Sequence, residues 1–243
     1  MRQLAQVLAI SRKDVESYYG KPPLVTWGLL LPAVLILAVY LKDRDGYLTV
    51  APGMIAMTLL FGNTSMAAIV ITFEKRAGTL ERLLLAPLAA PAIVAGKALS
   101  AAAYSLGTSL VLTAGFVVFL GMPVARPGVL ALGLVLGAGT FSVLGIVASV
   151  TVKEVFEAMT LMNFFRFPLL FVSGVFLPLS QMPGWARPLA YLSPLTHVVE
   201  LLRLGTSETA GFASARVLSG AAAGFFFLCC LMAGPVFRRC ASR

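Results

Sequence analysis

The stretch VLALGLVLGAGTFSVLGIVASV, residues 129–150, carries neither a charged side chain nor a proline. A helix needs about 20 apolar residues to cross the hydrocarbon core of a bilayer, so this segment is long enough to span a membrane. The whole chain of 243 residues has the same character, because 59% of its residues are hydrophobic and only 12% are charged. A soluble domain usually carries roughly 25% charged residues. The chain is therefore predicted to lie in a membrane.

Five further apolar stretches flank this segment, at residues 24–41, 48–72, 92–120, 156–177 and 216–237. In a bilayer, a helix is the structure that satisfies every backbone polar group within such a stretch. The sequence thus predicts an all-α integral membrane protein with six transmembrane helices, in one transmembrane domain over residues 24–243. Gly133 with Gly137, and Gly220 with Gly224, have the small-xxx-small spacing that lets membrane helices approach closely.

Basic residues exceed acidic ones and give a formal net charge of +9. They are dispersed rather than clustered, which indicates topology and contact with membrane lipids rather than nucleic-acid binding. With the N-terminus inside, twelve of the 19 lysines and arginines lie in inner segments and six in outer ones. The positive-inside rule therefore predicts a multi-pass protein with both termini in the cytoplasm.

One arginine interrupts the apolar run 156–177. Arg166 carries a guanidinium that stays charged at working pH. Its placement at bilayer depth costs between about 3 and over ~10 kcal/mol, and such residues usually face a wet path or a partner. Asn163 lies one helical turn earlier on the same face. We expect Arg166 and Asn163 to line a substrate path, with a structural hydrogen-bonding role as the alternative.

The segment before the first span, residues 1–23, is predicted to form an amphipathic helix on the inner membrane surface. Gly20 and the pair Pro22-Pro23 would end it. A disordered tail is the alternative. The apolar residues of the predicted face are Leu4, Val7, Leu8, Val15, Tyr18 and Tyr19.

The inner loop 73–91 is predicted to contain a short helix at residues 80–86, limited by Pro87. Thr79 is the expected N-cap after the flexible Gly78, and the helix dipole favours Glu81 in the first turn. The leucines at 83–85 need a cover, which indicates either docking to another protein or burial in the membrane surface.

The segment 178–205 lies outside and is broken by several prolines, among them Pro178 and Pro183. Ser193 followed by Pro194 predicts the start of a helix over residues 195–204, ended by Gly205. We expect this segment to dip back into the outer leaflet between spans five and six, which is tolerated where protein surrounds it.

Two motifs together resemble one family. The first is FEKRAGTLERLL at residues 73–84, with Pro87 and Gly96-Lys97, and the second is FVSGVFLPLSQMP at 171–183, with Trp185, PLTH at 194–197 and ELLR at 200–203. With the six-span plan, they resemble the membrane subunits of ABC-2 type ABC exporters over nearly the whole chain. The similarity is to the daunorubicin-resistance and nodulation-factor branches.

The resemblance implies the permease of an exporter in a prokaryotic inner membrane, which moves a drug, lipid or lipid-linked glycan by alternating access. Two permease copies, more simply a homodimer than a heterodimer, would join two ABC ATPase subunits. Residues 1–23 would connect to the ATPase. The coupling loop 73–91 would act through Glu74, Lys75, Arg76, Gly78, Thr79, Glu81 and Arg82. The outer re-entrant gate would act through Ser173, Gly174, Pro178, Pro183, Pro194, His197, Glu200 and Arg203.

The chain contains no Gly-x-x-x-x-Gly-Lys-Ser/Thr phosphate loop, because Gly20-Lys21 precedes a proline and Gly96-Lys97 an alanine. We therefore expect the chain to be no enzyme and to bind no cofactor, with ATP and Mg²⁺ used by the partner subunit. Its three cysteines lack the spacing of a metal site.

Two other functions remain open. A stand-alone secondary carrier or channel would transport without ATP, although the sequence offers no deep carboxylate for ion coupling. An intramembrane serine protease would need Ser173 and His197 to act together.

Overall fold

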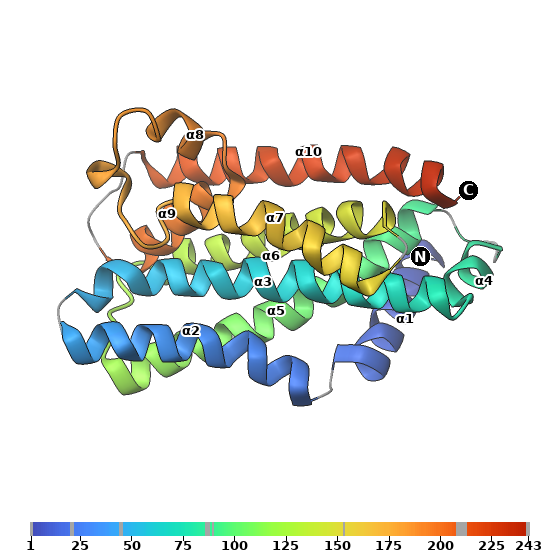
Figure 1. The fold of residues 1–243 in the computed structure, drawn as a ribbon, viewed down its shortest axis with the longest axis horizontal. Helices are drawn as coiled ribbons and strands as arrows, with labels where there is room; N and C mark the ends of the chain where they lie inside the picture. Colours follow the sequence, from blue (N-terminus) through green and yellow to red (C-terminus); the bar gives the residue numbers. More distant parts are fainter. Residues whose placement is uncertain are drawn as a thin grey trace.

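The structure, a computed structural model, describes residues 2–19, 22–43, 46–85, 88, 90–152, 154–207 and 213–241. Six long helices lie side by side in an elongated bundle (Figure 1), and the described residues include no strand. Five of them, α3, α5, α6, α7 and α10, are long and apolar enough to cross a membrane, whereas the assessed stretch of α2, Leu29–Lys42, is shorter. The all-α membrane fold is thus confirmed, with five to six helices able to span. The long helices are α2 (Pro22–Lys42), α3 (Tyr47–Arg76), α5 (Ala90–Leu120), α6 (Pro127–Val150), α7 (Val155–Val172) and α10 (Ala215–Ala241).

Helix α3 is the centre of the bundle and is buried along most of its length by α2, α5, α6 and α7. Glycines allow the close approaches. A Cβ added at Gly145 of α6 would lie 2.8 Å from the Cα of Thr64, and one at Gly137 would lie 3.0 Å from Leu59. The predicted packing role of Gly133 and Gly137 is confirmed. Gly220 and Gly224 make no such approach within this chain, because a Cβ at either position would meet open space, so their packing role stays a prediction.

Short helices occupy the two ends of the bundle (Figure 1). At one end lie α1 (Arg2–Asp14), the π-helix Val15–Tyr19 and α4 (Thr79–Leu85), near both chain termini. At the other lie the 3₁₀ turn η2 (Leu179–Gln181), α8 (Arg187–Tyr191) and α9 (Pro194–Thr206). The loop after α3 and the segment after α7 therefore lie far apart, at opposite ends of the spans.

The N-terminal segment differs from the prediction in its end and in its packing face. Pro22 begins α2 rather than ending the first helix, and Gly20 and Lys21 lie outside the described residues. The buried positions of α1 are Ile10, Ser11 and Asp14, while Leu4 and Leu8 are exposed. Contact with α5 selects this face, since a Cβ at Gly96 would lie 2.8 Å from Ile10.

Three other predicted boundaries shift. Helix α7 ends at Val172 instead of 177, because Gly174 turns the chain with φ +78°. Helix α9 begins at Pro194 after Ser193, as predicted, but continues to Thr206. Thr79 is the first residue of α4 rather than its N-cap, and its hydroxyl donates to the carbonyl oxygen of Glu74 over 3.2 Å. Pro87 lies outside the described residues.

Candidate functional site

Three consecutive residues at the end of α3 bind three different sets of neighbours. Glu74 binds α1 and α5, Lys75 binds the end of α6, and Arg76 binds the start of α7. Because consecutive residues on a helix point about 100° apart, one turn of α3 can reach in three directions. We call Glu74, Lys75 and Arg76 the hub.

Glu74 is the centre of a buried ion cluster. Its carboxylate accepts hydrogen bonds from the ammonium groups of Lys13 and Lys97. Asp14 completes the cluster, with one oxygen 3.3 Å from Lys97 Nζ and the other 3.2 Å from Lys13 Nζ. Asp14, Glu74 and Lys97 are all at most 2% exposed. Two anions and two cations balance, as buried charges require.

Lys13 closes the cluster on its outer side and is half exposed. Partial burial opposes its charged form, but the hydrogen bond and charge of Glu74, with the charge of Asp14, outweigh burial and raise the pKa of this ammonium above its ordinary value. The cluster therefore holds α1, the end of α3 and the start of α5 together as one charged unit.

Lys75 and Arg76 extend the hub to the next two helices. Lys75 Nζ donates to the carbonyl oxygens of Val150 at 2.6 Å and Val152 at 2.9 Å, where the last turn of α6 leaves carbonyls unpaired. Arg76 pairs with the exposed Glu154 over 3.2 Å, and Glu154 is the N-cap of α7. The hub therefore contacts α6 and α7 as well as α1 and α5.

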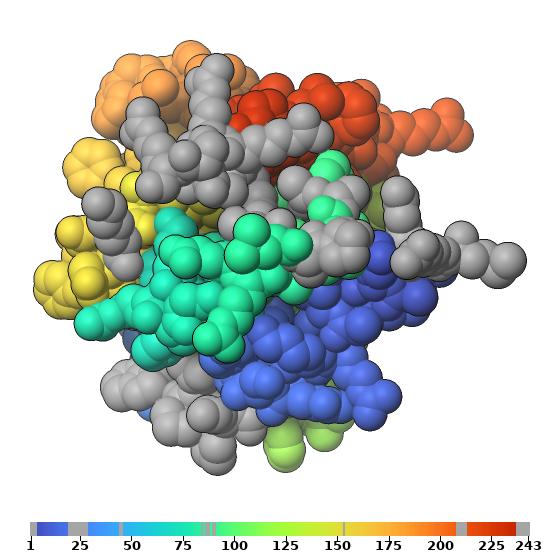
Figure 2. Space-filling view, turned by 90° about the vertical axis from the view of Figure 1, so that its right-hand side faces the viewer, coloured from blue at the N-terminus to red at the C-terminus, as the bar shows by residue number. Residues whose placement is uncertain are grey.

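Helix α4 protrudes beside the hub, and Figure 2 shows it on the outer surface of this end, next to α1. Gly78, with φ +66°, makes the sharp turn from α3 into α4. Leu80 is buried and anchors α4, whereas Glu81, Arg82 and Leu85 are exposed, Leu85 to 87%. Glu74 was expected to share this outward surface, but its carboxylate is enclosed by the chain's own lysines. Among the predicted coupling residues, the exposed ones are Arg76, Thr79, Glu81 and Arg82, and of these Arg76 pairs with Glu154.

Arg166 is enclosed between α7 and α3 and is 3% exposed. Its Nε donates to the hydroxyl of Thr64 at 2.7 Å, and Nη1 donates to Asn163 Oδ1 at 3.2 Å. Its guanidinium carbon lies 5.0 Å from the ring centroid of Phe61, a cation–π distance. Nη2 is buried without a hydrogen-bond partner, and no described carboxylate lies within ion-pair distance. The predicted shared face of Arg166 and Asn163 is present, and the cation has spare hydrogen-bonding capacity.

The outer segment is tied to the end of α7 through the predicted gate residues. Arg203 bonds the carboxylate of Glu200 and donates from Nη2 to the carbonyl oxygen of Gly174 at 3.0 Å. The hydroxyls of Ser173 and Ser193 are 2.6 Å apart and buried. These contacts fix the turn between α7 and η2 against α9.

Other gate residues shape the backbone of this segment. The carbonyl oxygens of Pro178 and Pro183 accept turn hydrogen bonds from Gln181 and Ala186 over 2.9 and 3.0 Å. Pro194 is the first residue of α9. His197 Nε2 donates to the carbonyl oxygen of Tyr191 over 3.0 Å. Ser173 and His197 thus bind different partners, which gives no support to a protease pair.

Sequence reasoning missed Asp14 and Lys97 as members of the inner cluster. Asp14 follows Val7 by seven residues and so falls on the stripe that packs on α5, a signal that the predicted face overlooked. Lys97 was treated as an inner loop charge, although it lies within the apolar stretch 92–120. A lysine about two turns inside an apolar helix needs a carboxylate partner, and that need could have pointed to Glu74.

Residues 5–206 match the sequence model of ABC-2 type transporters. The chain belongs to this family. It is 28% identical over 159 residues to the inner membrane transport permease YadH of Escherichia coli strain K12. This aligned region covers 64% of this chain and 61% of YadH. It is similar to two further relatives. The putative transport permease ycf38 of Cyanophora paradoxa is 28% identical, with 63% of this chain and 53% of ycf38 covered. The probable multidrug ABC transporter permease YbhR of E. coli strain K12 is 26% identical, with 68% and 45% covered.

The chain thus spans about three fifths of the length of YadH and about half of the length of the other two relatives. The family match includes the hub, α4 and the whole outer segment through Thr206. It ends before α10, so the sixth long helix is described by the structure and lies outside the matched residues.

Proposed function

We propose that this chain is the permease subunit of an ATP-driven ABC exporter that moves an amphiphilic substrate by alternating access. The observation that carries the proposal is the hub, in a chain that belongs to the ABC-2 type family. Three residues of one helical turn bind α1, α5, α6 and α7 beside an exposed short helix. A push on α4 would therefore reach four neighbouring helices at once.

The power source in this proposal is a separate ABC ATPase, which uses ATP and Mg²⁺. Helix α4 docks on it through Leu85, Glu81 and Arg82, the outward groups beside the hub. An exposed leucine flanked by charges is typical of the core and rim of a protein interface. Residues 1–19 add a second contact, because the buried ion cluster fastens α1 to the same hub.

The substrate path in this proposal passes Arg166 and Asn163. Arg166 has a spare donor, Nη2, and lacks a carboxylate partner among the described residues. A cation with these properties favours cargo that carries an anionic group. Aromatic side chains near Arg166 on α7, among them Phe164 and Phe167, are exposed and suit the apolar part of an amphiphile.

The assembly in this proposal contains two permease copies and two ATPase subunits in a prokaryotic inner membrane, with both termini of the chain in the cytoplasm. A homodimer is the simplest arrangement, since closed twofold symmetry is the commonest among oligomers. Most of α7 is not buried within one copy, so this helix offers a surface on which a second copy could pack. At the other end of the spans, Arg203 and Ser173 tie the end of α7 to α9 and to the residue before it, and in this proposal these contacts restrain the outer gate.

The test compares two exposed leucines at opposite ends of the bundle. The chain and its ATPase are reconstituted in liposomes, and Leu85→Asp in α4 is compared with Leu189→Asp in α8, which is also exposed. We expect Leu85→Asp to abolish co-purification of the ATPase and ATP-dependent transport, while Leu189→Asp retains ATPase binding. Equal binding by both variants would refute the docking role of α4. Transport by the purified chain without ATPase or ATP would instead show a stand-alone carrier or channel.

A further inference from the structure

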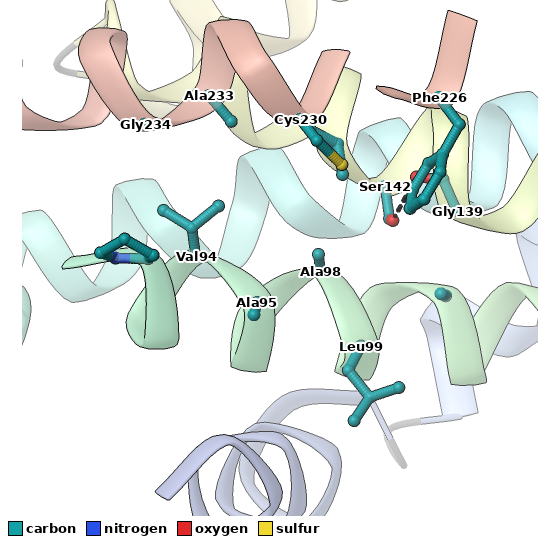
Figure 3. Close-up of a pocket in the computed structure, with 13 residues that line it drawn as sticks. Val94, Ala95, Ala98, Leu99, Gly139, Ser142, Phe226, Cys230, Ala233 and Gly234 are labelled. Carbon is teal, nitrogen blue, oxygen red and sulfur yellow. Dashed lines mark hydrogen bonds between the residues drawn. The ribbon is translucent and has the colours of Figure 1, made fainter. Parts of the chain in front are cut away.

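A cavity of about 470 Å³ lies between α5, α6 and α10, on the side of α5 that faces α10 (Figure 3). Its floor includes Val94, Val143 and Ala233, which are buried. Its rim includes Ala95 and Cys230, which are exposed. The cavity therefore opens sideways, out of the bundle, between α5 and α10.

The cavity is an elongated slot that runs along α5. On α5 its lining extends from Pro91 to Ala102, which at ~1.5 Å per residue is about 16 Å, or roughly half of the ~30 Å hydrocarbon core. A slot of this length reaches across about one leaflet of a bilayer.

The walls of the cavity offer dispersion contacts and almost no polar ones. None of the described lining residues is charged. Ser142 supplies a hydroxyl, but it already donates to the carbonyl oxygen of Gly139 at 2.9 Å, the dashed line in Figure 3. Water needs two or more polar partners to occupy a buried site, so this slot does not suit water.

We propose that this slot binds one acyl chain of a membrane phospholipid from the leaflet that borders α1 and α4. The three lining helices can each span a membrane, so the slot lies at bilayer depth, where hydrocarbon chains surround it. Its length matches one leaflet of the bilayer. Since the lining carries no charge, the site selects the chain and not the head group.

The site also adjoins the coupling region, because one helix serves both. The first turns of α5 carry Lys97 of the ion cluster and Gly96, which packs on α1, while Val94 and Ala98 line the slot. A bound chain would therefore support the wall of α5 opposite the cluster. The proposal stands or falls separately from the transport function, because its test reads lipid attachment and not transport.

The test uses the full-length chain in vesicles of phosphatidylethanolamine that contain a small fraction of the same lipid with a diazirine in the middle of one acyl chain. After illumination, attached lipid is mapped by peptide mass spectrometry. We expect attachment to concentrate on residues 91–102 and 226–234, to saturate, and to be equal for phosphatidylglycerol with the same chains. Attachment spread evenly over other exposed apolar residues, such as Val111 and Val118 of α5, would overturn the proposal.

A matched pair of variants locates the site. Ala98→Trp fills the slot, whereas Ala103→Trp adds the same ring to the exposed side of the same helix. We expect attachment in the slot to fall roughly tenfold for Ala98→Trp and to stay unchanged for Ala103→Trp. Equal attachment in both variants would contradict the assignment.

A second measurement avoids any folding defect of Ala98→Trp. In a chain with Cys229→Ala and Cys240→Ala, complete alkylation of Cys230 by N-ethylmaleimide adds bulk at the rim after folding. Attachment in the slot should fall by a similar factor. Unchanged attachment after complete alkylation, or a Cys230 disulfide between two copies, would exclude a resident acyl chain.

Discussion

Removal of the Lys97 ammonium should be the most damaging single change in the inner cluster. In Lys97→Met, the carboxylates of Asp14 and Glu74 stay buried and share only Lys13, which is half exposed. Loss of one partner from a buried ion pair costs about 3–5 kcal/mol, because the remaining charge is desolvated and uncompensated. Lys13 offsets part of this cost, so we expect about 3 kcal/mol.

This free energy corresponds to a large fall in thermal stability. For a chain of this length, 1 kcal/mol shifts Tm by about 2–4 °C, so Lys97→Met should lower Tm by roughly 6–12 °C. The assay is the loss of the monodisperse gel-filtration peak after heating in detergent. The matched control is Arg12→Gln, which breaks an exposed pair with Glu16 on α1, where both side chains are more than half exposed, and should leave Tm unchanged.

A double variant separates electrostatics from packing. Glu74→Leu added to Lys97→Met removes one cation and one anion, and it leaves Lys13 with Asp14. Because a balanced apolar replacement of a buried pair is often nearly neutral, the double variant should recover more than half of the lost Tm. A Tm for Lys97→Met within about 1 °C of the native value, or simple addition of the two single losses, would refute the assigned role of the cluster.

Three further predictions follow from other contacts. Lys75→Met removes the donor to the carbonyl oxygens of Val150 and Val152 and should lower the stability by about 1 kcal/mol in the same thermal assay. The control Arg82→Met, on the exposed α4, should not change the stability measurably. Gly53→Ala places a Cβ 2.1 Å from the carbonyl oxygen of Val175 and should destabilise the chain by about 1–3 kcal/mol or more. The control Gly220→Ala meets open space and should stabilise the helix slightly, so equal thermal shifts of the two variants would contradict this packing. Arg166→Met should keep or raise Tm, because it removes a buried cation that has no carboxylate partner among the described residues. It should also reduce transport of anionic cargo in liposomes, and unchanged transport would make Arg166 purely structural.

The long helices could be predicted because bilayer thickness fixes the length of an apolar stretch. The run 129–150 became α6 within a few residues, and Ser193-Pro194 marked the start of α9. The end of α7 could not be read from hydropathy, because residues 173–177 are small or apolar, yet the chain leaves the helix there at the Gly174 turn. Hydropathy measures how strongly side chains prefer an apolar environment, and it contains no information on the direction of the backbone.

The candidate site was only partly predictable. The loop residues Glu74 to Arg82 were found as a motif, but which of them face outward was not. Glu74 and Glu81 look alike in sequence, yet one is enclosed by two lysines and the other is exposed. The difference depends on Asp14 and Lys97, which are far from Glu74 along the chain and reach it only after α1 packs on α5. The sequence signals for this meeting were the place of Asp14 on the stripe that packs on α5 and the position of a lysine within an apolar helix.

The position of α9 has a consequence for the biogenesis of the chain. This helix packs against α3 and α6, which the ribosome makes before it, and against α10, which is made after it. Leu201 and Leu204 of α9 share a cluster with Leu218 and Ala222 of α10, so the side of this cluster that α10 covers stays exposed until translation reaches the last span. We expect nascent chains that stall before α10 to be recognised and degraded by membrane proteases, which makes the final span a checkpoint for correct assembly.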